Sequence, residues 1–152
     1  NLNYISDKNF NEYFKFSVVR DPVDRIVSEL NWRRIEKGFS GVQSIKHYIE
    51  TVLRYNKKDS DKVRHIMPQA NFLFDSSNDK LLVDKIIKFE DIKVEADKLH
   101  KNFCKPHSPK IEHVNQSINK IWTKDDISNS DVEFISEFYS EDFKLINRIS
   151  DN

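Results

Sequence analysis

Arg20 and Ser28 are the residues whose types and spacing most directly suggest chemistry. Arg20 stands between an expected strand and an expected helix, and Ser28 lies about two helical turns further on. An arginine can bind a phosphate through two N–H groups at once, and a serine hydroxyl can add a further hydrogen bond. Free N–H groups at the start of the helix, with the positive end of its dipole, would complete such an anion site. In the alternative interpretation, Arg20 pairs with Asp24 or Glu90 and Ser28 is an ordinary surface residue.

The sequence around this arginine predicts a buried strand that runs directly into a helix. Residues 14–19 are mostly aromatic or β-branched, which is typical of a strand covered on both faces. Asp21 is a good N-cap, and Pro22 suits the first helical position. The apolar residues that follow recur at helical spacing and would form one buried face: Val23, Ile26, Val27 and Leu30. We expect this helix to run to about Lys37 and to stop at Gly38.

The rest of the chain alternates between helical and strand patterns. Helices are expected over residues 6–13, 42–55, 92–103 and 140–149, with another that begins at Ser130 or Asp131, and a second strand is expected over residues 81–89. Residues 63–75 should be irregular, because Pro68 disfavours a helical conformation at the residue before it. Within the first long helix, Arg25 can pair with Asp21 one turn earlier. Strands separated by helices predict an α/β fold with a mainly parallel sheet, in a single domain over residues 1–152.

The composition excludes several classes of protein. Lys and Arg number 25, as do Asp and Glu, so the formal net charge is zero. Nucleic-acid-binding and membrane-surface proteins usually carry a basic excess, and no apolar run here approaches membrane-spanning length. The sequence has only two glycines and neither of the glycine-rich nucleotide-binding patterns. Any nucleotide chemistry must therefore use another type of binding site, or a part of the protein that is missing from this chain.

Several sequence blocks together resemble a known family. Residues 16–30, Phe-Ser-Val-Val-Arg-Asp-Pro-Val-Asp-Arg-Ile-Val-Ser-Glu-Leu, closely resemble the 3′-phosphate-binding signature of the carbohydrate sulfotransferases. Enzymes of this family move a sulfuryl group from 3′-phosphoadenosine 5′-phosphosulfate (PAPS) to a sugar hydroxyl. Four further blocks follow in the family's order: a His-x-x-Pro-Gln segment at 65–75, a strand with acidic residues at 83–92, an Asn-x-Ser turn at 114–117 and a closing Tyr-x-x-Asp-Phe at 138–143.

The resemblance implies that Arg20 and Ser28 bind the 3′-phosphate of PAPS within a P-loop-NTPase-like α/β fold. In the family, a lysine-bearing loop after the first strand holds the 5′-phosphosulfate. That loop would precede the region matched here. We therefore expect the chain to be a fragment that is incomplete at its N-terminus and holds one end of the donor.

His65 is the candidate general base of such a reaction, since a neutral imidazole near pH 7 can take the proton of an attacking sugar hydroxyl. In the alternative interpretation it is a surface or hydrogen-bonding histidine beside the acceptor groove. Trp32 and Trp122 could stack on a sugar ring, with burial expected for at least one of them.

The polar connection over residues 105–120 is a third candidate site. In relatives such late loops close over the nucleotide half of the donor, a role that Asn115, Ser117 and Lys120 could fill; otherwise the connection is a solvated loop. Three residues of this region form a C-x2-H-x5-H pattern: Cys104, His107 and His113. No fourth ligand is evident and the spacing fits no common zinc module, so we expect no metal.

These observations predict a PAPS-dependent sulfotransferase acting on a glycan hydroxyl, with no nucleic-acid partner and no membrane contact from this segment. A homo-oligomer remains open. The alternatives are a non-catalytic module that binds nucleotide or glycan, and an unrelated nucleotide-dependent transferase that shares only the strand–arginine–helix device. The Lys-, Asn- and Ile-rich composition with one cysteine favours a bacterial cytoplasmic enzyme. Many relatives are Golgi proteins, and their membrane anchor would lie upstream of Asn1.

Overall fold

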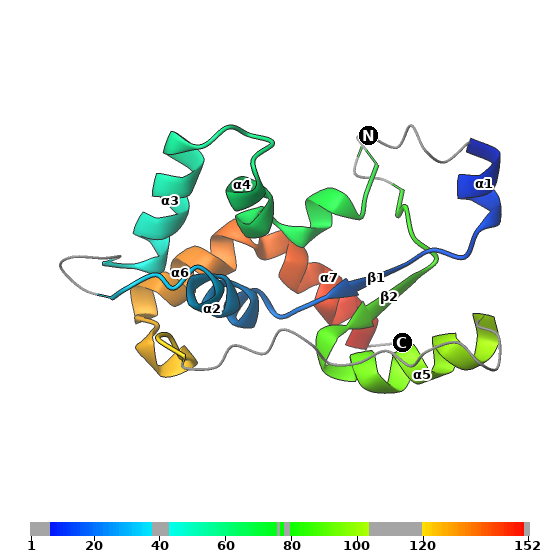
Figure 1. Ribbon diagram of the computed structural model, residues 1–152. Helices are drawn as coiled ribbons and strands as arrows, with labels where there is room; N and C mark the ends of the chain where they lie inside the picture. The colour runs from blue at the N-terminus through cyan, green and yellow to red at the C-terminus, as the bar shows by residue number, and fades with distance from the viewer. Residues whose placement is uncertain (1–6, 38–42, 76, 78–79, 104–119, 151–152) are drawn as a thin grey trace.

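The computed structural model describes residues 7–37, 43–75, 77, 80–103 and 120–150. The predicted α/β fold, with a parallel sheet flanked by helices, is confirmed (Figure 1). The elements are α1 (Asp7–Glu12), β1 (Phe16–Val19), α2 (Pro22–Trp32), α3 (Ile45–Tyr55), α4 (Asp61–Ile66), the 3-10 helix η1 (Gln69–Phe72), β2 (Lys85–Lys88), η2 (Phe89–Asp91), α5 (Ile92–Phe103), η3 (Lys124–Asp126), α6 (Asn129–Phe138) and α7 (Ser140–Ser150). In the described part of the sheet, β1 pairs in parallel with β2, and Val19 lies opposite Lys88.

Figure 1 shows two groups of elements joined by a long helix. Helices α2, α3, α4 and α6 lie together at one end, β1, β2 and α5 lie at the other, and α7 runs between the two groups. Each group has its own core. The helical core is formed by residues of α2, α3, α4, α6 and by Trp122, whereas Val19, Leu73 and Leu145 form the core beside the sheet.

Helix α2 begins where the sequence predicts and ends earlier. The Asp21 carboxylate accepts a hydrogen bond from Asp24 N at 3.0 Å, which caps the start. The predicted end near Gly38 is wrong, because the helix stops at Trp32. Arg34 adopts a positive φ of 52°, and Ile35 N then donates to Leu30 O at 2.9 Å. This closing turn is the one that glycine usually makes, and it brings Ile35 back onto the helical core.

Helix α4 was not expected, since the sequence predicted no helix here and the second part of α4 lies in the segment predicted to be irregular. Ser60 caps it by accepting from Val63 N, and two of its residues, Val63 and Ile66, are buried. It ends at Met67, whose ψ of 146° is the extended conformation that a following proline favours. The sequence identified the end of this helix without identifying the helix.

The remaining elements differ from expectation mainly at their boundaries. Strand β2 covers only 85–88, because Leu81 instead forms an isolated antiparallel bridge with Phe74. The cap of α6 is Ser128 and not Ser130 or Asp131. In α3, which Ser44 caps, Leu53 is 40% exposed although the residue before it, Val52, is buried.

Candidate functional site

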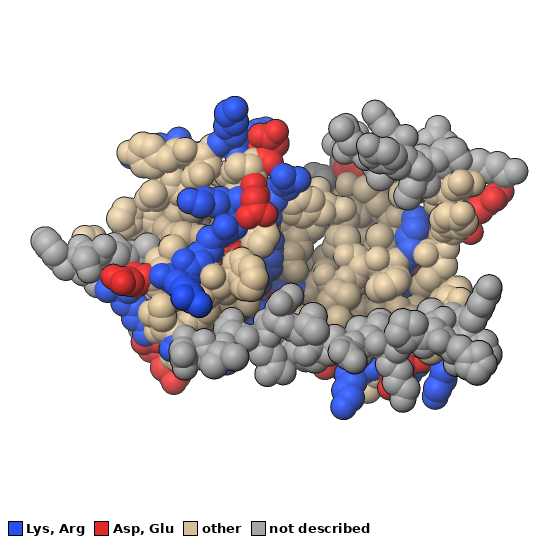
Figure 2. All heavy atoms as spheres, in the orientation of Figure 1, with Lys and Arg blue, Asp and Glu red and all other residues tan. Residues whose placement is uncertain are grey.

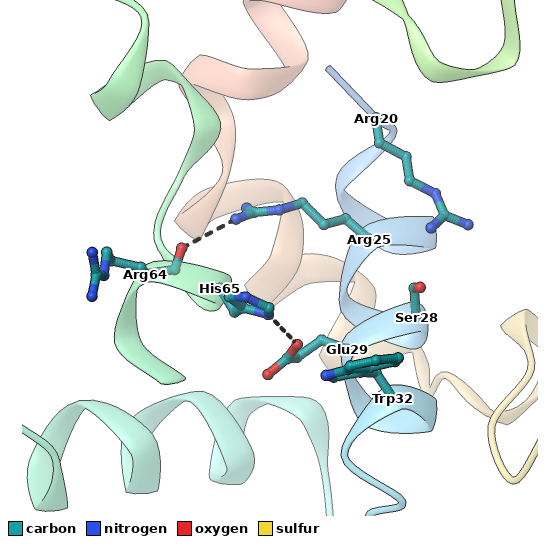
Figure 3. Close-up of a pocket in the computed structure, with 7 residues that line it drawn as sticks. All are labelled: Arg20, Arg25, Ser28, Glu29, Trp32, Arg64 and His65. Carbon is teal, nitrogen blue, oxygen red and sulfur yellow. Dashed lines mark hydrogen bonds and ion pairs between the residues drawn. The ribbon is translucent and has the colours of Figure 1, made fainter. Parts of the chain in front are cut away.

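A cavity of about 430 Å³ opens along one flank of α2 (Figure 3). The structure brings three of the predicted site residues, Arg20, Ser28 and His65, to this one cavity. Arg20 comes from the β1–α2 junction, Ser28 from the middle of α2, and His65 from α4. The other lining residues are Arg25, Glu29, Trp32 and Arg64.

The backbone of Arg20 is held in place by the side chain of Gln69. Arg20 N donates to Gln69 Oε1 at 3.0 Å, and Gln69 Nε2 donates back to Arg20 O at 2.8 Å. The guanidinium carbon lies 4.7 Å from the centre of the Phe89 ring. The chain therefore fixes both ends of this arginine without using a carboxylate.

Arg20 retains unused hydrogen-bonding capacity. Its Nε is buried and has no hydrogen-bond partner among the described residues. No ion pair joins Arg20 to Asp24 or Glu90 in the described part of the chain, and Asp24 pairs instead with Lys124 at 2.9 Å. A buried donor without a partner costs about 1–3 kcal/mol.

The polar groups on this side of the cavity come from side chains more than from the start of the helix. Figure 3 shows the Ser28 hydroxyl and the Arg20 guanidinium on the same side of α2. Of the N–H groups expected to be free at the helix start, that of Asp24 is already bonded to Asp21. The side chain of the capping residue thus occupies one of the backbone N–H groups that the sequence predicted to be free for an anion.

Arg25 does not pair with Asp21 as expected. Its Nη1 donates to Met67 O at 2.6 Å and its Nη2 to Arg64 O at 3.4 Å. These carbonyls lie at the end of α4, where a helix leaves its last acceptors unsatisfied and favours a cation. Arg25 therefore joins α2 to the helix that carries His65.

Two polar residues of the closing block, 138–143, hold the segment between α4 and η1 in place. Asp142 is fully buried, and its carboxylate accepts from Gln69 N at 2.9 Å and from Ala70 N at 2.8 Å. The Tyr139 hydroxyl donates to Ile66 O at 2.6 Å. Sequence reasoning assigned no role to Gln69, Tyr139 or Asp142, and their only signal was their place in the quoted blocks.

His65 contacts a buried acid that sequence reasoning also missed. Its Nδ1 lies 2.8 Å from Glu29 Oε2, and Glu29 is only 5% exposed. The other oxygen of Glu29 accepts from Arg33 Nε at 2.6 Å and from the Tyr48 hydroxyl at 3.3 Å. The available signal was an acidic residue next to the apolar stripe of α2.

The sequence model of the sulfotransferase family matches residues 2–147, which is nearly the whole chain. The chain belongs to the sulfotransferase family. No curated protein and no solved structure matches it. Among the described residues of this sulfotransferase, no helix is both long and apolar enough to cross a membrane.

The other predicted site residues of the sulfotransferase contribute less to the cavity. Trp32 lines it and is 59% exposed, whereas Trp122 is buried and donates from Nε1 to Ile35 O at 2.8 Å. Lys120 is exposed and does not line the cavity. Five residues named from the sequence lie outside the described residues: Asn115, Ser117, Cys104, His107 and His113. Within the described residues, no group of His, Cys, Asp or Glu has the arrangement of a metal site.

A second cavity, of about 390 Å³, differs from the first in the charge of its lining. It lies where β1 and β2 end, and it is lined by Val19, Asp21, Lys88, Glu90, Asp91 and Ile146. Three carboxylates face a single lysine there, so a phosphate would be repelled. The cavity along the flank of α2 has the opposite balance, with three arginines and one carboxylate in its lining, and Figure 2 shows Lys and Arg side chains gathered over α4 and α2.

Proposed function

We propose that this sulfotransferase uses PAPS as its sulfuryl donor and that Arg20 and Ser28 bind the 3′-phosphate of the donor. The observation that carries the proposal is the buried Arg20 Nε, which has no partner among the described residues and belongs to a side chain that lines a cavity with Ser28. A phosphate offers several acceptor oxygens, and charge-assisted hydrogen bonds to it are the strong ones.

The charges around the cavity support an anionic ligand. Arg20, Arg25 and Arg64 line it, and Glu29 is the one carboxylate in the lining. Glu29 already interacts with Arg33 and His65, so it offers little repulsion to a phosphate. Figure 2 shows Lys and Arg side chains gathered over α4 and α2, with fewer acidic side chains among them. Such a surface attracts a polyanionic donor from solution.

We further propose that the acceptor is a carbohydrate hydroxyl. Trp32 presents an exposed indole at the wall of the cavity, and aromatic faces of this kind pack well on sugar rings. His65 lines the same cavity and is the proposed general base. The bound donor supplies the activated sulfuryl group. The residues of this chain hold its 3′-phosphate, present the acceptor and take up the hydroxyl proton.

The experiment that tests this function combines competition with transfer. In a binding assay with a fluorescent 3′,5′-bisphosphate, unlabelled adenosine 3′,5′-bisphosphate (PAP) should compete and ATP, which lacks a 3′-phosphate, should not. Radiolabelled sulfuryl should pass from PAPS to at least one member of a panel of glycans. Equal competition by ATP would contradict the donor assignment. Binding of PAP without any transfer would favour the non-catalytic module instead.

A further inference from the structure

Glu29 is a buried acid whose oxygens are all in use. Only 5% of the residue is exposed, on a helix face that otherwise carries apolar side chains. A carboxylate is buried at acceptable cost only when it is paired and hydrogen-bonded. Oε1 accepts from Arg33 Nε and from the Tyr48 hydroxyl, and Oε2 contacts His65 Nδ1. The acid thus links α2, α3 and α4 at the wall of the cavity (Figure 3).

The donors on Oε1 determine which partner carries the proton on Oε2. Burial, and secondarily the charge of Glu29, raises the pKa of Tyr48, so this hydroxyl keeps its hydrogen and donates it. The Arg33 guanidinium can only donate. With two donors already on Oε1, Glu29 acts as an acceptor towards His65 as well. The hydrogen in the contact at 2.8 Å therefore belongs to Nδ1.

A neutral imidazole with its hydrogen on Nδ1 has its lone pair on Nε2. The nearest carboxylate oxygen to Nε2 is Asp61 Oδ1 at 3.4 Å, and Asp61 is paired with Arg33 Nη2 at 2.6 Å. The 3.4 Å contact is too long for a good hydrogen bond, yet close enough to stabilise a positive charge on the ring. The His65 side chain is 44% exposed and lines the cavity that contains Arg20. Because Nδ1 is engaged by Glu29, Nε2 is the ring nitrogen left to accept a proton.

We propose that Glu29 is a positioning residue, which holds His65 in the Nδ1-protonated tautomer so that Nε2 can accept the proton of the sugar hydroxyl. This inference rests on the proposed function. The hydroxyl oxygen forms a bond to sulfur, its proton passes to Nε2, and the sulfur–oxygen bond to the donor phosphate breaks with its electron pair leaving on the phosphate. Glu29 and Asp61 then flank the imidazolium that results.

The first test is made on the unmodified protein, so it does not depend on a variant that folds. Nitrogen-15 chemical shifts of the imidazole rings report which nitrogen carries the hydrogen, and the spectrum of His65→Asn identifies the signals of His65. At a pH where the ring is neutral, His65 should show a protonated Nδ1 and an unprotonated Nε2. A ring protonated on Nε2 would overturn the inference.

The second test replaces the acceptor oxygen by a donor. In Glu29→Gln, the side-chain amide can turn its NH₂ group towards His65, so the tautomer preference should be lost or reversed. The kcat of sulfuryl transfer should fall at least about 10-fold, as for loss of an oriented general base, while the Kd for PAP stays unchanged. The matched control is Glu50→Gln, because Glu50 is an exposed acid on α3 outside the cavity. This variant should keep the wild-type tautomer of His65, the wild-type kcat and the wild-type Kd.

The outcomes separate this inference from the proposed function. A Glu29→Gln protein that unfolds more easily, but keeps both the wild-type tautomer and the wild-type kcat, would assign Glu29 a structural role only and overturn the inference. Failure of the unmodified protein to bind PAP would contradict the donor site, whatever the tautomer of His65.

Discussion

The two sides of the cavity along α2 are built in opposite ways. On one side, the Arg20 Nε is buried without a hydrogen-bond partner among the described residues, and the Ser28 hydroxyl lies on the same side of α2 (Figure 3). On the other side, Glu29 accepts from Arg33 and Tyr48, and its second oxygen lies 2.8 Å from His65 Nδ1. The first side has a donor group without a partner within the described residues, whereas the oxygens of Glu29 on the second side all contact other side chains. We therefore interpret the first side as the proposed binding surface and the second as the proposed positioning network.

This comparison predicts that substitutions on the two sides will be detected by different measurements. Removing a side chain from the unsatisfied side breaks few contacts within the protein, so it should change ligand binding and leave folding nearly intact. Removing one from the satisfied side leaves buried partners without their bonds, so it should change folding first.

The largest effect is expected for Glu29→Ala. The substitution leaves the Tyr48 hydroxyl without its acceptor and removes one of the two carboxylates that pair with Arg33. Removing one member of a buried ion pair costs about 3–5 kcal/mol. Because Arg33 keeps its contact with Asp61, we expect the free energy of unfolding to fall by an amount at the lower end of this range, about 3 kcal/mol. Urea unfolding measures it. A Glu29→Ala protein as stable as Ser28→Ala would remove the distinction between the two sides.

Gln69→Ala should affect both properties, because Gln69 connects Arg20 to the buried Asp142. The variant loses the two hydrogen bonds to the Arg20 backbone, which should lower the free energy of unfolding by about 1 kcal/mol each. With its backbone released, Arg20 should bind PAP several-fold more weakly. Calorimetric titration and urea unfolding together test this. Loss of stability with an unchanged Kd would show that Arg20 does not need this support.

Ser28→Ala should weaken binding of PAP and nothing else. One hydrogen bond from a hydroxyl to a charged phosphate is worth about 1.5 kcal/mol, or about 10-fold in Kd. The free energy of unfolding should stay within the range of a surface substitution, about 0.5 kcal/mol. Ser136→Ala is the matched control, because Ser136 lies on α6 and bonds only to the carbonyl of Val132. Equal Kd values for the two variants would exclude Ser28 from the phosphate site.

The smallest effect is expected for an ion pair on neither side of the cavity. Hydrogen bonds from Lys37, and then from Thr123, lower the pKa of Asp126 from 3.8 to about 2. Because the pKa of Asp126 is lower in the folded state than in the unfolded state, its ionised form stabilises the folded protein. This contribution is complete above pH 3.8 and is lost as the pH falls towards 2. Asp126→Asn should therefore lose less stability than the wild type between pH 5 and 2. Identical losses in chemical unfolding would show that the pair contributes nothing.

The sequence predicted features that depend on neighbouring residues, and it missed those that depend on contacts between distant segments. The strand, Asp21 as cap and Pro22 as first helical residue are local features, and the structure has all three. The prediction that the strand is buried on both faces is wrong, because it begins at Phe16, which is 48% exposed, and of its four residues Val19 alone is buried. Residues 20 and 28 were identified from neighbours in the same segment. The contacts that place His65 beside Glu29, and Gln69 beside Arg20, join segments far apart in the sequence, and no local pattern encodes them. The end of α2 at a left-handed arginine was missed because glycine is the residue expected in that conformation.

The central claim, that Arg20 binds the 3′-phosphate of the donor, is tested most directly by changing the protein and the ligand together. PAP and adenosine 5′-phosphate, which lacks the 3′-phosphate, would be titrated into the wild type, Arg20→Ala and the control Arg54→Ala, an exposed arginine on α3. An arginine–phosphate contact is worth about 1.5–3 kcal/mol, so the wild type and Arg54→Ala should prefer PAP by about 10- to 100-fold. Arg20→Ala should lose most of this preference, keep at most the part that Ser28 supplies, and bind adenosine 5′-phosphate as the wild type does. A preference for PAP in Arg20→Ala as large as that of the wild type would contradict the account.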